Sequence, residues 1–371
     1  MDIDVETEVK KFIKVWLIVL ASLTYCHFIS KIIPKGFKRL FSILPVISIF
    51  LYLPLTLLSV HFIFIVGFTV SWVVNFKLLL FAFNHGPLSN PSPEDPSSYF
   101  SLKQFISTAC LPIKIKQKSH SAEDTAIHDQ TISRRNPKVS SIVRLLNNYP
   151  MKVLTMCLLV HVYSYKQYIH PLFLGSLYAL HMFFISETYL VVSNAFAALI
   201  LRLDDLEPQF IDPFISTSLQ DFWGRRWNLM ATNILWLTVY VPIRSFCTHV
   251  IGRKWAAVPA ILFTFLVSGL MHELIIYYIT RLYPTWEVTC FFVIQGICIA
   301  FGGIMKKTNI GGIHDRFQLH SWISGPLILV FIGANVICFF FPPILRNNID
   351  DRTIEEYHIL VDYIVKKFAR K

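Results

Sequence analysis

Long runs of apolar residues, separated by short polar segments, set the organisation of this chain. A helix that crosses a bilayer needs about 20 consecutive apolar residues, because each residue adds about 1.5 Å of length. Candidate runs lie at Phe12–Ser30, Leu40–Val60, Phe62–Phe83, Met151–Tyr165, Pro171–Leu201, Leu229–Phe246, Trp255–Ile279, Val288–Met305 and Trp322–Phe341. The pattern predicts an all-α integral membrane protein with eight to ten transmembrane or re-entrant helices.

Two of these runs depart from a simple span. Pro171–Leu201 is longer than one crossing needs, so we expect it to be either strongly tilted or broken. Leu229–Phe246 contains Asn233, Pro242 and Arg244, and we interpret it as either a full span or a re-entrant segment. The first run follows an acidic start and lacks the small residues of a processing site, so we predict that it is a retained span.

Charged residues indicate which loops lie on which side of the membrane. The chain is 54% hydrophobic and 15% charged, with a formal net charge of +11. Its Lys and Arg residues stand in loops beside the apolar runs, as in cytosolic loops of membrane proteins, so we expect no nucleic-acid partner. Residues 31–39 are rich in Lys and Arg and predict a cytosolic loop, whereas Ser59–His61 lacks them and predicts a lumenal one.

These observations divide the chain into four parts. Residues 1–83 form an N-terminal three-span segment, and residues 84–150 form a basic, partly disordered cytosolic loop in which Phe100–Ile115 has the pattern of a short amphipathic helix. Residues 151–343 form the membrane domain with the candidate chemistry, and residues 344–371 form an amphipathic tail that we expect on the anionic cytosolic leaflet. Seven scattered cysteines without a CxxC pair argue against a disulfide framework or a zinc site.

Ser216–Met230 (STSLQDFWGRRWNLM) holds two carboxamides, an acid, two adjacent arginines and two tryptophans beside an apolar run, which is more polar chemistry than a membrane border requires. Arg and Trp at the edge of a span are ordinary interface anchors, but anchoring does not explain the carboxamides and the acid. If the stretch is helical, Asp221 and Arg225 stand four residues apart and Asn228 follows three later, so one face carries all three. The candidate substrate-binding residues of this stretch are Gln220, Asp221, Trp223, Arg225, Arg226 and Trp227.

A second polar interruption, His272 and Glu273, falls inside a later apolar run. Two adjacent ionisable residues within an apolar span suggest a functional site. The alternative is a structural role, since a lone histidine in a helix bundle often only forms hydrogen bonds to neighbouring groups. On a helix, Ser268 lies one turn before His272 and is placed to orient the ring, while Glu273 points about 100° away, towards Tyr277. Ser268 and Glu273 are further candidate substrate-binding residues. We predict that His272 and Asn228 meet in one intramembrane reaction chamber.

Several common catalytic motifs are missing. The His272–Glu273 pair lacks the second histidine of an H-E-x-x-H zinc motif, and the chain has neither a G-x-S-x-G elbow nor a Walker A loop. The economical chemistry is direct transfer, in which His272 takes the proton of a hydroxyl that attacks a thioester carbonyl, with CoA as the leaving group. Asn228 would hold the acyl carbonyl, and Arg225 and Arg226 would meet the CoA phosphates. We expect no metal and no cofactor besides acyl-CoA as a substrate.

The chain resembles the wax synthase branch of the membrane-bound O-acyltransferase superfamily, the plant long-chain-alcohol O-fatty-acyltransferases, to which the plant sterol O-acyltransferases are close. The matching stretches are NFKLLLFAF at Asn75–Phe83, GPLS at Gly86–Ser89, CLPIKIK at Cys110–Lys116, DLEPQF at Asp205–Phe210, TSLQDFWGRRWNLM at Thr217–Met230 and FLVSGLMHEL at Phe265–Leu274. The resemblance implies transfer of a fatty acyl group from acyl-CoA to an alcohol among the lipids of the endoplasmic reticulum membrane. It also implies that the family's intramembrane histidine falls on His272 and its upstream Asn on Asn228.

Some alternatives stay open at this point. The acceptor is either a long-chain fatty alcohol, which would give a wax ester, or a sterol. A membrane transporter that uses His272 and Glu273 as a relay is the alternative from a different class. Glu187 is either a structural acid bonded to a neighbouring helix or a catalytic group, and it stands six residues after His181, so the two do not share a helix face.

Overall fold

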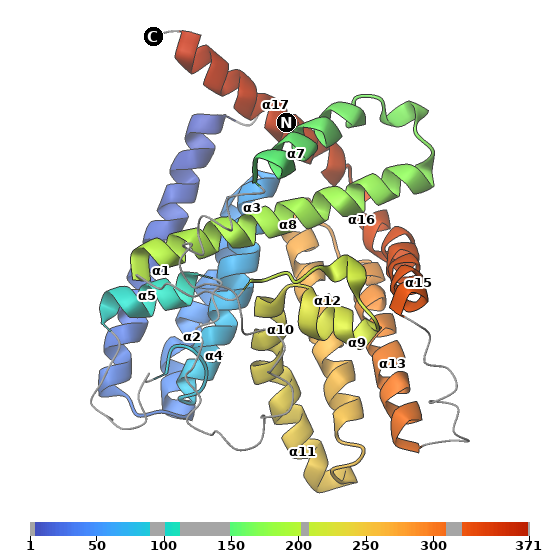
Figure 1. The fold of residues 1–371 in the computed structure, drawn as a ribbon. Coiled ribbons are helices and arrows are strands. Elements are labelled where there is room, and N and C mark those ends of the chain that lie inside the picture. The colour runs from blue at the N-terminus through green and yellow to red at the C-terminus, as the bar shows by residue number, and fades with distance from the viewer. Residues whose placement is uncertain (1–3, 90–100, 112–148, 202–207, 309–320, 370–371) are drawn as a thin grey trace, which may run out of the picture.

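The computed structural model describes residues 4–89, 101–111, 149–201, 208–308 and 321–369, and within these ranges it holds helices and turns but no β-strand (Figure 1). Most of the predicted basic loop, at residues 90–100 and 112–148, lies outside the described residues. Eight described helices are long and apolar enough to cross a membrane, at Val5–Ile32, Phe37–Thr56, Val60–Ala82, Pro171–Phe196, Leu229–Ile251, Ala257–Thr280, Glu287–Met305 and Ile323–Arg346. The predicted all-α membrane architecture is confirmed.

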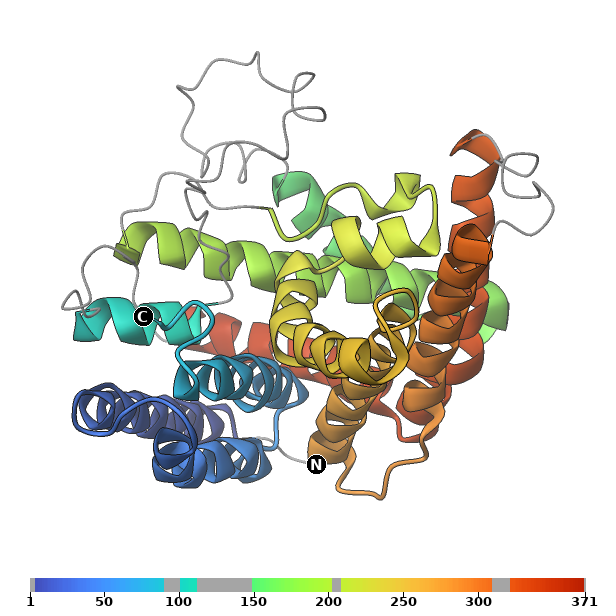
Figure 2. The same ribbon diagram turned by 90° about the horizontal axis from the view of Figure 1, so that it is seen from below.

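The N-terminal spans pack together at one edge of the protein (Figure 1, Figure 2). They comprise α1 (Val5–Ile32), α2 (Phe37–Tyr52), α3 (Val60–Val66) and α4 (Asn75–Ala82). A π-helical segment, Gly67–Val74, joins α3 to α4 as one continuous path. Side chains such as Leu23, Ile43, Phe50 and Leu78 are fully buried between these helices.

A short helix, α5 (Leu102–Cys110), packs on this N-terminal bundle. A capping box at Ser101 starts the helix. At its other end the buried ammonium group of Lys77 donates to the carbonyl oxygens of Thr108 at 2.6 Å and Leu111 at 2.7 Å. These carbonyls carry the negative end of the helix dipole, which favours a cation there. The amphipathic helix is therefore shorter than predicted, and α4 holds it in place.

The helix α8 (Pro171–Leu201) is unbroken over 31 residues and runs steeply across the other spans (Figure 1). The strongly tilted alternative therefore holds for this run. It forms a hairpin with α7 (Tyr149–Tyr163), and Lys152 of α7 donates from Nζ to Oε1 of Glu187 at 2.6 Å. This ion pair with a neighbouring helix favours the structural interpretation of Glu187.

The remaining spans form a second bundle beside the first. Its helices are α10 (Leu229–Leu235), α11 (Val241–Ile251), α12 (Ala257–Thr280), α13 (Glu287–Thr308), α15 (Ser321–Asn335) and α16 (Phe341–Arg346). π-Helical turns at Trp236–Tyr240 join α10 to α11, so that stretch is long enough for a full span. α12 and α13 pack closely at Gly269, which has no side chain. A Cβ at this position would lie only 2.8 Å from Cα of Thr289 in α13.

The C-terminal helix α17 (Ile349–Ala369) lies against the start of α3 (Figure 1). Glu356 accepts hydrogen bonds from Oγ of Ser59 at 2.7 Å, from the backbone N–H of Val60 at 2.5 Å and from Nδ1 of His61 at 2.6 Å. Burial raises the pKa of the Glu356 carboxyl, but these hydrogen bonds outweigh it and hold the pKa below its usual range. The tail and the Ser59–His61 connection therefore share one side, so the prediction of opposite sides is wrong.

Candidate active site

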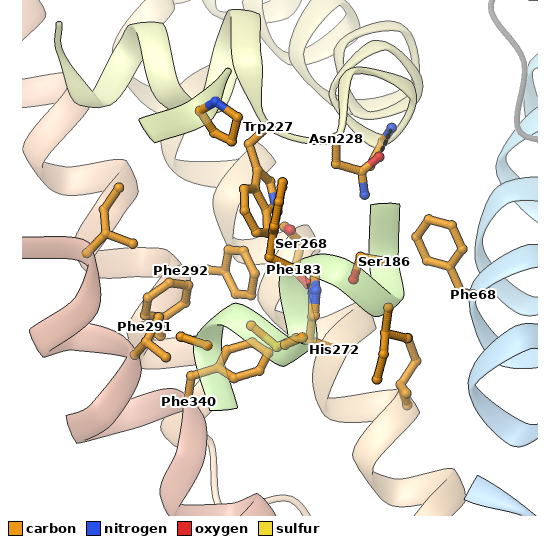
Figure 3. A pocket seen from close by; sticks show the side chains of 18 of the residues that line it. Phe68, Phe183, Ser186, Trp227, Asn228, Ser268, His272, Phe291, Phe292 and Phe340 are labelled. Atoms are coloured by element: carbon orange, nitrogen blue, oxygen red, sulfur yellow. Dashed lines mark hydrogen bonds between the residues drawn. The ribbon is translucent and has the colours of Figure 1, made fainter. Parts of the chain in front are cut away.

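A large cavity, of about 990 Å³, opens between α8, the N-terminal spans and the C-terminal bundle (Figure 3). Aromatic and aliphatic side chains make up most of its lining, including Phe68, Phe183, Phe291 and Phe340. This volume lies at the upper end of the range for small-molecule sites, about 300 to 1,000 Å³. The cavity can therefore hold long apolar chains away from water.

Four π-helical segments among the described residues all contribute side chains to the cavity lining. They are Gly67–Val74, Phe222–Arg226, Trp236–Tyr240 and Val336–Phe340. A π-turn widens the helix locally and shifts the register of the side chains that follow, and such turns occur frequently at functional sites. Here they aim aromatic side chains inwards from four different places in the fold.

Asn228 stands at the break between the polar segment and the next span. Its backbone is left-handed, with φ 42° and ψ 64°, a conformation that Asn tolerates better than most residues. Its Oδ1 accepts a hydrogen bond from the N–H of Ala231 at 3.2 Å and so caps α10. The cap occupies the oxygen and leaves the side-chain NH₂ for the cavity, which Asn228 lines (Figure 3).

His272 enters the cavity from the middle of α12. Its Nδ1 lies 2.7 Å from the backbone carbonyl oxygen of Ser268, so Nδ1 carries the ring proton and Nε2 is left with its lone pair. The sequence placed Ser268 correctly one turn before His272, although the carbonyl and not the hydroxyl makes the contact. Phe292 lies against the ring at a centroid distance of 4.4 Å, and Trp72 meets it edge-on at 5.3 Å.

The structure brings Asn228 and His272 onto the same cavity from two separate elements. In Figure 3 they lie on opposite sides of one open space, with Ser186 of α8 beside it. A carboxamide donor and an imidazole with a free Nε2 therefore face a chamber with a largely apolar, aromatic lining. The shared cavity agrees with the sequence interpretation, and the catalytic roles of the two residues stay a prediction.

Comparisons with known proteins show which protein family the chain resembles. A model of the membrane bound O-acyl transferase family matches residues 206–294, which include both Asn228 and His272. The chain is 38% identical to the long-chain-alcohol O-fatty-acyltransferase of Simmondsia chinensis over 98% of each chain. It is also 39% identical to acyl-CoA–sterol O-acyltransferase 1 of Arabidopsis thaliana over 96% of each chain.

A third relative, probable long-chain-alcohol O-fatty-acyltransferase 1 of Arabidopsis thaliana, is 38% identical over 96% of this chain and 97% of its own. The chain belongs to the membrane-bound O-acyltransferase family. It is therefore an O-acyltransferase, and the transporter alternative is set aside.

In this membrane-bound O-acyltransferase, four other predicted site residues line the cavity, namely Gln220, Trp223, Trp227 and Ser268. The rings of Trp223 and Trp227 meet edge-on with centroids 6.3 Å apart. Nε1 of Trp223 donates to Oε1 of the buried Gln295 at 3.3 Å, and Trp227 stacks on Phe222 at 5.3 Å. The indole rings thus form part of the chamber wall.

Asp221, Arg225 and Arg226 lie outside the cavity lining. Asp221 accepts from Nε of Arg226 at 2.7 Å, a partner five residues on, because the intervening turn is π-helical. The predicted helical face with Asp221, Arg225 and Asn228 is therefore wrong. Burial would raise the pKa of Asp221, but hydrogen bonds from Thr217 and Arg226 lower it below its usual range. The pair stabilises the turn that presents the tryptophans.

Glu273 also lies outside the lining and is 2% exposed. Its Oε1 accepts a hydrogen bond from the backbone N–H of Thr289 at 3.1 Å, near the start of α13. The predicted partner, Tyr277, is not the one observed, because the close approach of α13 offers a backbone donor instead. Glu273 thus ties α13 to the helix that carries His272.

Sequence reasoning missed three residues around His272 and the tryptophans. Trp72 and Phe292 contact the His272 ring, but apolar residues in apolar runs carry no signal that marks them. Gln295 is fully buried in α13 and bonds to Trp223. The sequence could have pointed to Gln295, because burying a lone carboxamide in an apolar span costs free energy unless it makes a specific hydrogen bond.

Proposed function

We propose that this O-acyltransferase moves a fatty acyl group from acyl-CoA directly to the hydroxyl of a long-chain alcohol, giving a wax ester and free CoA. The observation that carries the proposal is the shared cavity, in which His272 and Asn228 face one apolar space. The relative from Simmondsia chinensis is named as a long-chain-alcohol O-fatty-acyltransferase, which supports the same reaction class.

The chemistry follows from the tautomer of His272. Its Nδ1 proton is engaged by the Ser268 carbonyl, so Nε2 accepts the proton of the alcohol as the alcohol oxygen attacks the thioester carbonyl. The carbonyl oxygen becomes negatively charged, and the NH₂ of Asn228 donates to it. The intermediate then expels the CoA thiolate, and the imidazolium returns the proton to sulfur.

The aromatic lining has a chemical role in this scheme. Water competes with the alcohol for the acyl group, and a chamber walled by Trp72, Phe292 and Phe340 offers water few partners. The same low-polarity surroundings strengthen the hydrogen bond from Asn228 to the developing oxyanion. The cavity therefore favours ester formation over hydrolysis.

A sterol is the second candidate acceptor, because the chain is 39% identical to a relative named as an acyl-CoA–sterol O-acyltransferase. Microsomes that contain the expressed protein, given labelled acyl-CoA with either a fatty alcohol or a sterol, separate the two candidates. We expect label in the wax ester and at most traces in the sterol ester. Label in the sterol ester alone would replace the proposed acceptor, and label in neither would refute the proposal.

The role of His272 has a matched control in the same chain. His249 of α11 also bonds through Nδ1 to the carbonyl four residues before it, at 2.8 Å, but it is exposed and outside the cavity. His272→Ala should lower kcat by about 10² or more, the usual contribution of a general base. His249→Ala should stay within about twofold, since it loses a similar local contact without a catalytic group.

The proposal includes the endoplasmic reticulum membrane as the location. The eight apolar helices support a multi-pass membrane protein, and the choice of organelle rests on the family resemblance. A fluorescent fusion that coincides with a marker of this membrane in plant cells would agree with it. Fluorescence at the plasma membrane alone would contradict it.

A further inference from the structure

The cavity has a second polar end, formed by His61 of α3 and His181 of α8. This end lies far from His272 along the α3 wall. Trp72, whose ring meets that of His272, stands eleven residues after His61 on the same continuous helical path. At about 1.5 Å per residue the two ends are about 16 Å apart.

The outer nitrogen of His61 is set up as a hydrogen-bond acceptor. Its Nδ1 lies 2.6 Å from a carboxylate oxygen of Glu356 and donates to it, so the neutral ring keeps its lone pair on Nε2. That Nε2 atom is buried and has no hydrogen-bond partner among the residues that the structure describes. Glu356 is itself fixed by the start of α3, so the ring is held in one orientation.

His181 presents a second unpartnered nitrogen. The side chain is buried, at 6% exposure, and its ring stacks on Tyr163 with centroids 5.5 Å apart. The ring of Tyr357, on α17, lies near both histidines, with its centroid 6.1 Å from that of His181 and 4.7 Å from that of His61. Nε2 of His181 has no hydrogen-bond partner within the described ranges. A buried polar atom of this kind normally has a partner, and here the cavity is where one would bind.

We propose that His61 and His181 bind a hydroxyl group at the far end of a long-chain substrate, an inference that rests on the proposed acyl transfer. A hydroxyl matches both rings chemically, because it is able to donate to Nε2 of His61 and to accept from an Nε2–H of His181. An anionic group is disfavoured here, since His61 is bonded to the carboxylate of Glu356, while the nearby carboxylate of Asp350 is paired with Lys166. The enzyme would then take ω-hydroxylated chains as well as plain ones.

The length of the cavity sets the length of the substrate. A C–C bond of about 1.5 Å advances about 1.25 Å along an extended chain, so about 16 Å corresponds to a chain of about thirteen carbons. The hydroxyl stands either on the alcohol, as in an α,ω-diol, or on the acyl chain, as in an ω-hydroxyacyl-CoA. Both carry the same recognised group, and two arms of one experiment separate them.

The experiment compares hydroxylated and plain substrates of equal length in the same protein preparation. One arm gives acyl-CoA with a diol or the matching alcohol, and the other gives alcohol with ω-hydroxyacyl-CoA or acyl-CoA. The readout is the ratio of ester formed from the hydroxylated and the plain substrate, so it is independent of the amount of folded protein. His61→Phe and His181→Phe keep an aromatic ring but remove its nitrogens.

In one arm we expect each of these variants to lower the ratio by about tenfold, the effect of one lost hydrogen bond to a buried hydroxyl. That arm identifies which substrate carries the hydroxyl. Phe68→Leu is the control, because Phe68 lines the α3 wall between the two ends and changes size without changing polarity. A ratio that is equal in the wild type and both histidine variants, in both arms, overturns the proposal.

A binding measurement keeps this inference separate from the proposed reaction. Thermal unfolding of the purified protein is followed with the same hydroxylated and plain compounds, without turnover. We expect the hydroxylated member of one pair to stabilise the wild type more, and His181→Phe to remove the difference. If plain substrates give no ester but this difference is present, the proposed reaction fails and the hydroxyl site stands. If no pair shows a difference, the hydroxyl site is refuted.

Discussion

Asn228 offers the sharpest test of the reaction scheme because its structural and chemical roles can be separated. Structurally, it supplies a left-handed residue and an N-cap for α10. Chemically, its NH₂ would stabilise the oxyanion. Glycine adopts the left-handed conformation without strain and replaces a capping Asn at a cost of only a few tenths of a kcal/mol. Asn228→Gly therefore removes the amide while it keeps the fold.

The expected magnitudes follow from these contacts. Asn228→Gly should change stability by about 0.5 kcal/mol or less but lower kcat by about 10² to 10³, as when one oxyanion donor is removed. Asn228→Ala loses the cap, at about 1 kcal/mol, and forces an alanine into the left-handed region, at about 1 to 2 kcal/mol. The alanine variant should therefore be about 2 to 3 kcal/mol less stable, with the same loss of kcat in the folded fraction.

The assay measures ester formation per folded molecule, with thermal unfolding of each purified variant beside it. Asp212 provides the matched control, because its φ of 39° and ψ of 63° nearly equal those of Asn228 and it lies outside the cavity lining. Asp212→Gly should leave kcat within about twofold. An Asn228→Gly variant that keeps full activity would refute the chemical role of the amide and leave Asn228 as a cap alone.

Three further predictions concern packing, the tail and the substrate. Gly269→Ala should lower the stability of the protein by about 1 to 3 kcal/mol in thermal unfolding, because the new Cβ would meet the α13 backbone at 2.8 Å. Glu356→Gln should expose α17 to limited proteolysis, since it weakens a buried, charge-assisted contact worth about 2 kcal/mol. Arg225→Gln should raise the KM for acyl-CoA by about fivefold to tenfold if this exposed cation meets a CoA phosphate.

Each of these has a result that would count against it. Gly302 of α13 has open space around it, so Gly302→Ala should be neutral, and an equal loss at both glycines would dismiss the close contact. The folded-state pKa of Glu356 is lowered, so its stabilisation is complete above about pH 4.3 and disappears as the pH falls through that lower pKa. A tail that is equally protected at pH 7 and pH 3 would contradict the contact. An unchanged KM would leave Arg225 as a membrane anchor.

The spans could be predicted from the sequence because their cause is local. A run of about 20 apolar residues is stable across a bilayer whatever its neighbours do. His272 could be singled out for a related reason, since an ionisable side chain in such a run is costly unless it has a role. The position of Asn228 within a polar stretch beside a span carried a similar signal.

The features that sequence reasoning missed arise from contacts between distant segments or from irregular turns. The π-helical turn after Asp221 moved its partner from Arg225 to Arg226, and no pattern of apolar residues marks such a turn. Glu273 bonds to an α13 amide because α13 packs closely on α12 at Gly269, and the sequence of one helix alone does not reveal that contact. The prediction that the tail and the Ser59–His61 connection lie on opposite sides was wrong, because Lys and Arg content describes each segment by itself, whereas the contacts of Glu356 join α17 to the start of α3.

The most direct test of the central claim is a structure of the protein with a non-reactive acyl-CoA analogue and a long-chain alcohol bound. The account predicts the acyl carbonyl oxygen within hydrogen-bond distance of Nδ2 of Asn228, and the alcohol hydroxyl at Nε2 of His272. An acyl carbonyl that lies outside the cavity, or that reaches only one of these two side chains, would contradict it.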